Sequence, residues 1–126
     1  MSNEITISGT LKLRSGYLDV ARARGTFRVD QSAQGAHLST TTAGTTEAEL
    51  GTGDISTVGW AFLRNLDSND DNAHGVTFGI DVGGTYRPFG KMLSGEPALV
   101  RFAVDAVEIR SCELEDVPVL YCLFED

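Results

Sequence analysis

The feature that most constrains the fold is a series of short segments in which apolar and polar residues alternate. In the clearest of them, VTFGIDV at residues 76–82, every second residue is Val, Phe or Ile. A period of two puts all these apolar side chains on one face of a β-strand. The same period predicts further strands at residues 5–13, 27–31, 58–66 and 117–123. Residues 37–42 are rich in β-branched residues and are predicted as a short strand, and residues 99–104 and 107–112 are further candidates.

Glycine stands at the boundaries of these segments, and the chain of 126 residues has 14 of them. Turn signals at intervals of roughly 8–12 residues are typical of an all-β sandwich or barrel. A chain of this length folds as one domain, which buries about two-thirds of the surface that its unfolded form exposes. We therefore predict a single all-β domain over residues 1–126 with antiparallel sheets, in which residues 1–14 form an N-terminal strand or arm.

Other local signals are weaker or concern turns. TTEAEL, residues 45–50, has the Thr and Glu spacing of a capping box, but it is too short for more than about one helical turn. VARAR, residues 20–24, is expected to be a loop or a frayed strand end. Pro88 cannot donate to a ladder and belongs at a sheet edge or strand start. Ser94 and Gly95 suit a turn that leads into the next strand.

The strand predicted at residues 58–66 carries the only tryptophan of the chain. Val58, Trp60 and Phe62 share one face, and the other face is also apolar through Leu63, so we expect a central strand. Trp60 among large apolar neighbours is predicted to pack in the core, although an exposed tryptophan is a platform for sugar rings in carbohydrate-binding modules. Gly59 suits a β-bulge or a close-packed neighbour.

Charge and composition exclude several classes of function. The chain has 10 Lys and Arg against 18 Asp and Glu, a net charge of −8, and such an acidic domain is a poor nucleic-acid binder. The first ten residues lack the basic and apolar regions of a signal peptide. No apolar run approaches the ~20 residues that span a bilayer. Without a secretion signal, Cys112 and Cys122 are predicted to be reduced thiols on strands.

The acidic run DSNDDN begins like a calcium-binding loop. Asp67, Asn69 and Asp71 occupy the first, third and fifth positions. The sixth and twelfth positions are Asn72 and Phe78 instead of the glycine and glutamate that an EF-hand needs, and strands flank the loop. A looser calcium site at Asp67, Asn69 and Asp71 stays open, beside the simpler interpretation that these residues form turns.

No motif for catalysis or cofactor binding emerges from the sequence. His37 and His74 lack the neighbouring ligands of a metal site, and neither GxSxG nor HExxH is present. We predict no enzymatic activity and no cofactor. Arg64, at the end of an apolar strand, is expected to bind a carboxylate or loop carbonyls, or to act as an interface arginine. The residues predicted for an interface are Arg64, Asp70, Tyr86 and Phe89.

Several segments together resemble a family of small virion proteins of tailed bacteriophages. They are GTFRVDQS, TTEAELGTGDISTVGWAFLRNLDSND, GIDVGGTYRPFGKMLSGEPALVRFA and the C-terminal VLYCLFED, in this order over most of residues 25–126. The chain departs from the family at SNDDNAHG, where relatives tend to have a shorter continuation into the next strand. The resemblance implies a β-sandwich, often jelly-roll-like, that assembles on the particle.

The function implied by the resemblance is a capsid decoration (cement) protein or a fitting of the head or tail. Its partners would be the major capsid protein or other virion proteins and further copies of itself, as a dimer or trimer. It would be made in the host bacterial cytoplasm and reside in the virion. The alternative is a β-sandwich of a tail or head fibre that binds carbohydrate or the host surface. In either case no nucleic acid and no membrane is expected as a partner.

Overall fold

The computed structural model describes residues 5–15, 18–29, 35–69, 71–102, 107–111 and 116–125; in residues 5–15, 18–29 and 111 it describes the backbone. The chain divides into two compact units, Met1–Ser32 and Ala33–Asp126. Among the described residues, no helix is long and apolar enough to cross a membrane.

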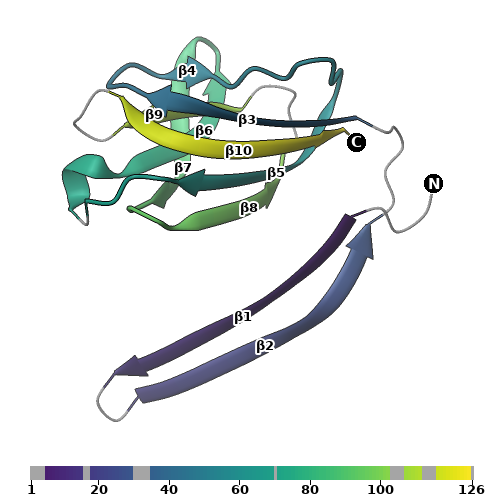
Figure 1. Cartoon of the computed structure of the whole chain (residues 1–126), viewed down its shortest axis with the longest axis vertical. Coiled ribbons are helices and arrows are strands. Elements are labelled where there is room, and N and C mark those ends of the chain that lie inside the picture. Colours follow the sequence, from purple (N-terminus) through teal and green to yellow (C-terminus); the bar gives the residue numbers. More distant parts are fainter. Residues whose placement is uncertain are drawn as a thin grey trace. The chain divides into compact units, whose positions relative to one another are not determined.

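The first unit is a β-hairpin, in which β1 (Ile5–Ser15) pairs antiparallel with β2 (Leu18–Val29) as a two-stranded sheet (Figure 1). The register places Ile5 opposite Val29 and shifts by a bulge between Ile7 and Gly9. β1 covers most of the segment for which an N-terminal strand or arm is predicted. The loop or frayed strand end expected at residues 20–24 is wrong, because these residues pair with β1 without a break.

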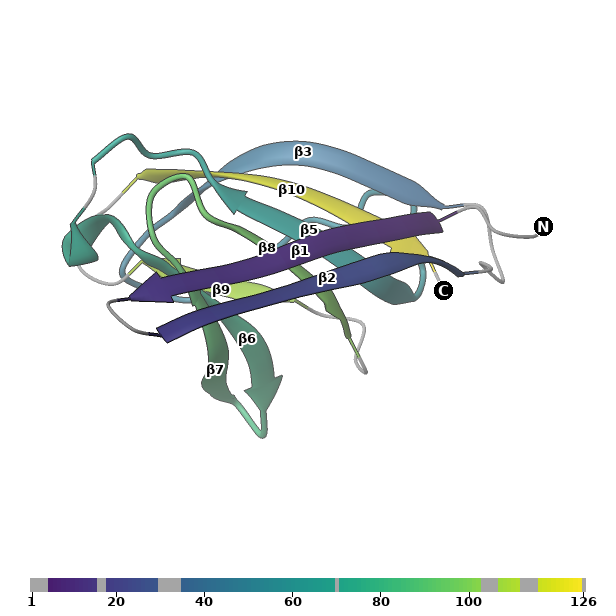
Figure 2. The ribbon, with the colours of Figure 1, turned by 90° about the horizontal axis from the view of Figure 1, so that it is seen from below.

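The described part of the second unit contains eight strands and one short 3-10 helix, η1 (Asn72–His74). One sheet has the order β3-β10-β5-β8 and the other the order β4-β9-β6-β7, with every pair antiparallel. The two sheets lie face to face (Figures 1 and 2), so the prediction of an all-β fold is confirmed. The bounds are β3 (Ala36–Ala43), β4 (Ala48–Glu49), β5 (Val58–Asn65), β6 (Val76–Val82), β7 (Thr85–Met92), β8 (Pro97–Arg101), β9 (Glu108–Ser111) and β10 (Val117–Glu125).

The pairing follows one long antiparallel ribbon. β6 pairs with β7, β5 with β8, β4 with β9 and β3 with β10, so successive pairs are nested around a single tip and alternate between the two sheets. The tip is the Gly83–Gly84 turn, where both residues have positive φ, 62° and 82°. A two-residue turn of this kind matches the twist of the strands it joins but requires residues that tolerate a left-handed backbone.

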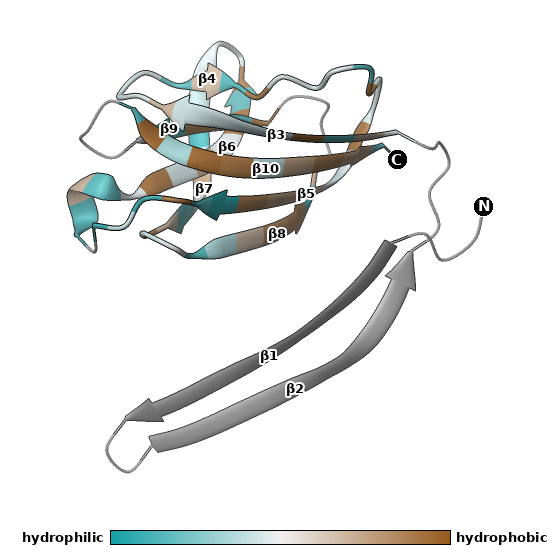
Figure 3. Cartoon of the chain, viewed as in Figure 1, coloured by the Kyte–Doolittle hydropathy of each residue, from teal (hydrophilic) through white to brown (hydrophobic). Residues whose placement is uncertain are grey.

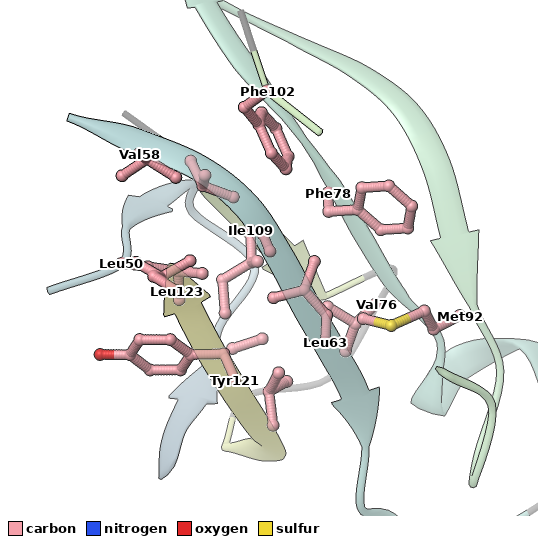
Figure 4. Packing of buried hydrophobic residues seen from close by; sticks show 14 of the residues in the cluster. Leu50, Val58, Leu63, Val76, Phe78, Met92, Phe102, Ile109, Tyr121 and Leu123 are labelled. Atoms are coloured by element: carbon pink, nitrogen blue, oxygen red, sulfur yellow. The ribbon is translucent and has the colours of Figure 1, made fainter. Parts of the chain in front are cut away.

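The core fills the space between the two sheets. β10 contributes a buried residue at every second position, and β5, β6 and β9 supply the residues that face it. Figure 4 shows Leu63 beside Val76, with Met92 next to them, and Phe78 near Phe102. The largest of the fully buried side chains are Leu63, Met92, Ile109 and Leu123. Strands with one inward apolar face explain this arrangement directly.

Two local predictions are wrong because tertiary pairing overrides local propensity. The capping pattern at residues 45–50 leads to no helical turn in the structure. Instead Ala48 and Glu49 pair with β9, and the Leu50 N–H donates to the Val107 carbonyl over 2.8 Å. Leu50 is buried in the core, so burial of this one side chain favours the extended conformation.

Trp60 and Phe62 lie on the opposite face of β5 from the one predicted. Ala61, Leu63 and Asn65 are buried, whereas Trp60 and Phe62 are half-buried. Val58 does point into the core, because a register shift separates it from the rest of the strand: Ala61 pairs with Leu123, but Val58 pairs with Glu125. The extra residue on β5 is a bulge at Gly59 and Trp60, and a bulge exchanges the two faces of a strand.

Candidate interaction surface

The outer face of the β3-β10-β5-β8 sheet, which points away from the core, carries an apolar row across its full width, with the exposed Arg64 and Arg101 beside it. The register places Leu38 opposite Cys122, Cys122 opposite Phe62 and Phe62 opposite Leu99, one apolar residue from each strand in a continuous row. Leu38 is 68% exposed and Leu99 41% exposed. We call this surface the outer apolar face; it comprises Leu38, Trp60, Phe62, Leu99, Leu120, Cys122 and Phe124.

β10 shows most clearly that this face is unusual for a solvated sheet. Its inward residues are buried, and its outward residues, Pro118, Leu120, Cys122 and Phe124, are apolar and half-buried. Figure 3 shows the strand coloured hydrophobic over most of its length. A sheet with one face in water alternates apolar and polar residues, whereas strands covered on both faces are apolar throughout. The sequence of β10 therefore indicates a second covering layer.

The outer face of the other sheet has the opposite character. Thr77 is paired with Lys91 on one side and with Arg110 on the other. Glu108 lies in the same sheet, and burial first, then the charges of Asp81, Glu47 and Glu49, raise the pKa of its carboxyl. A sheet face that is in contact with water carries mainly charged and polar residues. Only the β3-β10-β5-β8 sheet, among the described residues, presents an apolar outer surface.

Asn65 fixes the end of β5 and the loop that follows it. It is the single buried polar residue in the described part of the chain, with no exposed surface. Its amide nitrogen donates to the carbonyls of His74 over 2.8 Å and of Met92 over 3.2 Å, and its Oδ1 accepts from the Asp67 N–H over 2.9 Å. One side chain thus links β5, η1 and β7. It supplies hydrogen-bond partners for backbone groups at a buried strand end, which need them because they are shielded from water.

The polar loop after β5 satisfies its own hydrogen bonds. Oδ1 of Asp67 accepts from the Asn69 N–H over 2.8 Å, the turn predicted for these residues. The Ser94 hydroxyl donates to the Asn69 carbonyl, and the Lys91 ammonium contacts the Asn72 side chain. Within the described residues, no group of three or more His, Cys, Asp and Glu is arranged to hold a metal ion. The predicted interface residue Asp70 lies outside the described residues.

Asp71, the third residue of the calcium hypothesis, is engaged by His74. Its Oδ1 accepts from the His74 N–H over 3.1 Å and contacts Nδ1 of the ring. The hydrogen bond with Asp71 raises the pKa of His74 above its ordinary value of 6.5, although partial desolvation opposes the shift. The same bond lowers the pKa of Asp71 below its ordinary value of 3.8. This carboxylate therefore caps η1.

We expect Asp71→Asn to lower the pKa of His74. The pKa of His74 is raised, so its contribution to stability is complete below pH 6.5 and is lost as the pH rises through the pKa of the folded state. The pKa of Asp71 is lowered, so its contribution is complete above pH 3.8 and is lost as the pH falls through the pKa of the folded state. The pair is therefore most favourable between roughly pH 4 and pH 6.5. NMR titration of the His74 ring, with the His37 ring as the internal reference, measures the change. An unaltered His74 titration in Asp71→Asn would contradict the pairing.

The other predicted interface residues are not brought to one place. Arg64 is exposed on the β3-β10-β5-β8 sheet, where its Nε donates to the Gly95 carbonyl over 3.3 Å, which confirms the expected loop contact. Tyr86 belongs to the other sheet, where it is buried beneath Arg110, 5.1 Å from its ring centroid. The hydroxyl of Tyr86 shares a hydrogen bond of 2.9 Å with Thr77, so this side chain is occupied within its own sheet.

Phe89 is 55% exposed at a bulge of the edge strand β7, as the position of Pro88 predicts for this segment. Its ring packs edge-on against Phe78, with centroids 5.4 Å apart, and lies 5.5 Å from the ring of Phe102. Phe78 belongs to the second sheet, and Phe102 directly follows β8 of the first. Phe89 therefore covers the open side of the sandwich between the two sheets with part of its ring, and its interface role stays a prediction.

An open depression of about 660 Å³ lies at the end of β3, lined by Gly35, Ala36, His37, Gly53, Asp54, Ile55 and Glu125. The Glu125 carboxylate accepts from the Ser56 hydroxyl over 2.7 Å and from the Ser56 N–H over 3.0 Å, and these bonds lower its pKa. The ring of His37 packs against Tyr121. The depression lacks the exposed aromatic platform that a sugar-binding site uses, as far as its described lining shows.

The interface prediction missed every residue of the outer apolar face. It named one residue beside that face, Arg64. The available signal was the unbroken apolar run VPVLYCLF at residues 117–124, which one buried face does not explain. Comparison of the chain with protein-family models, with curated protein sequences and with solved structures gave no match.

Proposed function

We propose that this protein is a non-enzymatic structural component of a tailed-bacteriophage virion, a capsid decoration protein that binds capsid subunits and stabilises the particle. The observation that carries the proposal is the outer apolar face, with Leu38 and Leu99 exposed at its two edges. Contiguous apolar surface of this kind on a stable domain marks a protein–protein contact. A protein that works by assembly needs such a surface and no reaction centre.

The architecture supports the same proposal. The nested ribbon pairing of β3 with β10 through β6 with β7 supports the jelly-roll-like arrangement that we propose, and double-sheet jelly rolls are used by viral capsid and lectin domains. The sequence segments that resemble virion proteins include β5 and β10, the two central strands of the sheet that bears the outer apolar face. Fold alone does not assign a function, so the surface carries more weight than the architecture.

A binding experiment with capsid shells that lack the protein tests this function. We expect the purified chain to co-sediment with expanded shells and to saturate at a fixed ratio to the capsid subunit, and we expect a raised temperature of shell disruption, because a ligand of the assembled state stabilises it. Glycan arrays and host-cell pull-downs serve as the comparison. A chain that leaves the shells unbound but binds glycans or cells would favour the host-surface module and overturn the proposal.

A further inference from the structure

The edge strand β3 carries none of the features that protect the edge of a sheet. It pairs with β10 without a register shift, and in the part of the chain that the structure describes its backbone bonds to no backbone group outside this pair. Figure 2 shows β3 at the rim of its sheet. Its eight residues, AHLSTTTA, include no Asp, Glu, Lys, Arg or Pro. A regular, uncharged edge of this kind presents a row of free N–H and C=O groups that can pair with another strand.

Every other free edge among the described strands is protected. β8 begins with Pro97 and ends with Arg101, and β7 has a bulge at Phe89 directly after Pro88. β4 is only two residues long. The two strands of the hairpin carry five basic residues, Lys12, Arg14, Arg22, Arg24 and Arg28. Proline, bulges, short strands and Lys or Arg side chains are the means by which sheets prevent edge-to-edge pairing, so β3 is the exception.

The edge that matches β3 is a second β3. If two copies pair antiparallel about Thr40, Leu38 of each copy lies opposite Thr42 of the other, and the remaining opposed residues are small or hydroxyl side chains. Threonine and serine directly opposite each other stabilise an antiparallel pair. Opposed residues share a face of the sheet, so the exposed side of β3 in both copies lies on the same surface. Pairing about Thr40 also leaves Ala36, and the connection to the hairpin, outside the ladder.

We infer that the protein forms a two-fold symmetric dimer through antiparallel pairing of β3 with β3 of a second copy. The two four-stranded sheets then join into one continuous sheet, with the two β3 strands at its centre. Such an interface is isologous, because each copy contributes the same strand. The outer apolar faces of the two copies lie side by side on this sheet. The inference goes beyond the proposed function, which concerns the contact with the capsid.

Disulfide formation at the two-fold axis tests the pairing. In a background of Cys112→Ser and Cys122→Ser, Thr40→Cys places two thiols directly opposite each other, with Cα atoms roughly 4.5–5.5 Å apart, which a disulfide can bridge. Thr42→Cys is the matched control on the same exposed side of β3, because its two copies are four positions, about 13 Å, apart. We expect disulfide-linked dimers at least ~10-fold faster with Thr40→Cys. Equal rates in the two variants, or no dimer in either, would overturn the inference.

A mixture of two variants tests the register. Leu38→Cys and Thr42→Cys, in the same background, should each stay unlinked alone and should form a mixed disulfide dimer when combined, since the two positions lie opposite each other. Mass spectrometry of the two chains identifies the mixed product. A mixture that links no faster than its components would contradict pairing about Thr40.

Sedimentation equilibrium of the full chain without capsid gives an independent test. The wild type is expected as a dimer, and Thr40→Lys should weaken it at least ~10-fold, because two like charges then lie opposite each other. An equimolar mixture of Thr40→Lys and Thr40→Asp should restore the dimer. Val82→Lys is the matched control, since Val82 is 54% exposed at the β6–β7 turn, and should leave the dimer intact.

The outcomes separate this inference from the proposed function. A monomeric wild type that still binds shells would overturn the pairing of β3 alone, as expected if the chain's own hairpin or a strand of another protein occupied this edge. A dimer that ignores Thr40→Lys would overturn it as well. A dimer that responds to Thr40→Lys but leaves shells unbound would support the pairing and overturn the capsid function alone.

Discussion

Replacement of Asn65 by leucine is expected to destabilise the protein by about 3–4 kcal/mol, which lowers the melting temperature by roughly 10–15 °C for a domain of this size. The side chain is fully buried and makes three hydrogen bonds, to the carbonyls of His74 and Met92 and from the Asp67 N–H. Leucine fills a similar volume but leaves these backbone groups without their partner, and each buried unsatisfied group costs about 1–3 kcal/mol. Thermal and urea denaturation measure the loss.

Two further variants separate hydrogen bonding from packing at this position. Asn65→Asp keeps the shape but replaces the amide donor by an acceptor that faces two carbonyl oxygens, so we expect a loss at neutral pH as large as that of Asn65→Leu, with partial recovery in acid. Asn69→Leu is the matched control in the same loop, because Asn69 is exposed, and should change stability by less than about 0.5 kcal/mol. Equal effects of Asn65→Leu and Asn69→Leu would disprove the role assigned to Asn65.

The alternation of apolar and polar residues predicted part of the sandwich. β5, β6 and β10 lie where period two places them, and β3 lies where β-branched residues predict a strand, because burial of one face is a strong and local constraint. No strand was predicted for β7. The edge position of the strand with Pro88 and the turn at Gly95, which has φ of 79°, were also predictable from the residue types. Both follow from backbone chemistry that a single residue fixes.

The predictions that failed depended on contacts between distant residues. Ala48 and Glu49 are extended because they pair with Ile109 and Glu108, about sixty positions away. The bulge at Gly59 places Trp60 outside the core, and the sequence contains a bulge-compatible glycine but not the register that decides it. The hydrogen bonds of Asn65 reach Met92, 27 residues further along the chain. No local pattern encodes such partners.

The apolar character of the candidate surface could be predicted from the sequence, but its position on the molecule could not. The apolar residues on both faces of the segments at 58–63 and 117–124 predict a sheet face that is apolar on its outer side, and this pattern is present in the sequence. The row from Leu38 to Leu99 exists only because β10 lies between β3 and β5, and β5 lies beside β8. This strand order results from the nesting of the ribbon, which joins residues about 60 positions apart on one face.

The second prediction with a large effect follows from the two faces of β5, where Leu63 is buried and Phe62 is half-buried. Removal of the smaller side chain should destabilise the protein more than removal of the larger one. Leu63→Ala is expected to cost about 3–4 kcal/mol, because Leu63 has no exposed surface and its deletion leaves a cavity beside Val76 and Met92 (Figure 4). Phe62→Ala removes a larger side chain, yet it should cost less, since Phe62 is half-buried on the outer face.

Leu66→Ala is the matched deletion directly after the same strand. Leu66 is 42% exposed, so the same three carbon atoms are removed from a site that is already hydrated, and we expect a loss below about 1 kcal/mol. Urea denaturation at a protein concentration where the chain is monomeric keeps assembly out of the comparison. If Phe62→Ala destabilised the monomer more than Leu63→Ala, the core would lie on the Trp60 and Phe62 face of β5. The outer apolar face would then lose its central residue, because Phe62 is the member that joins Cys122 to Leu99 across the sheet.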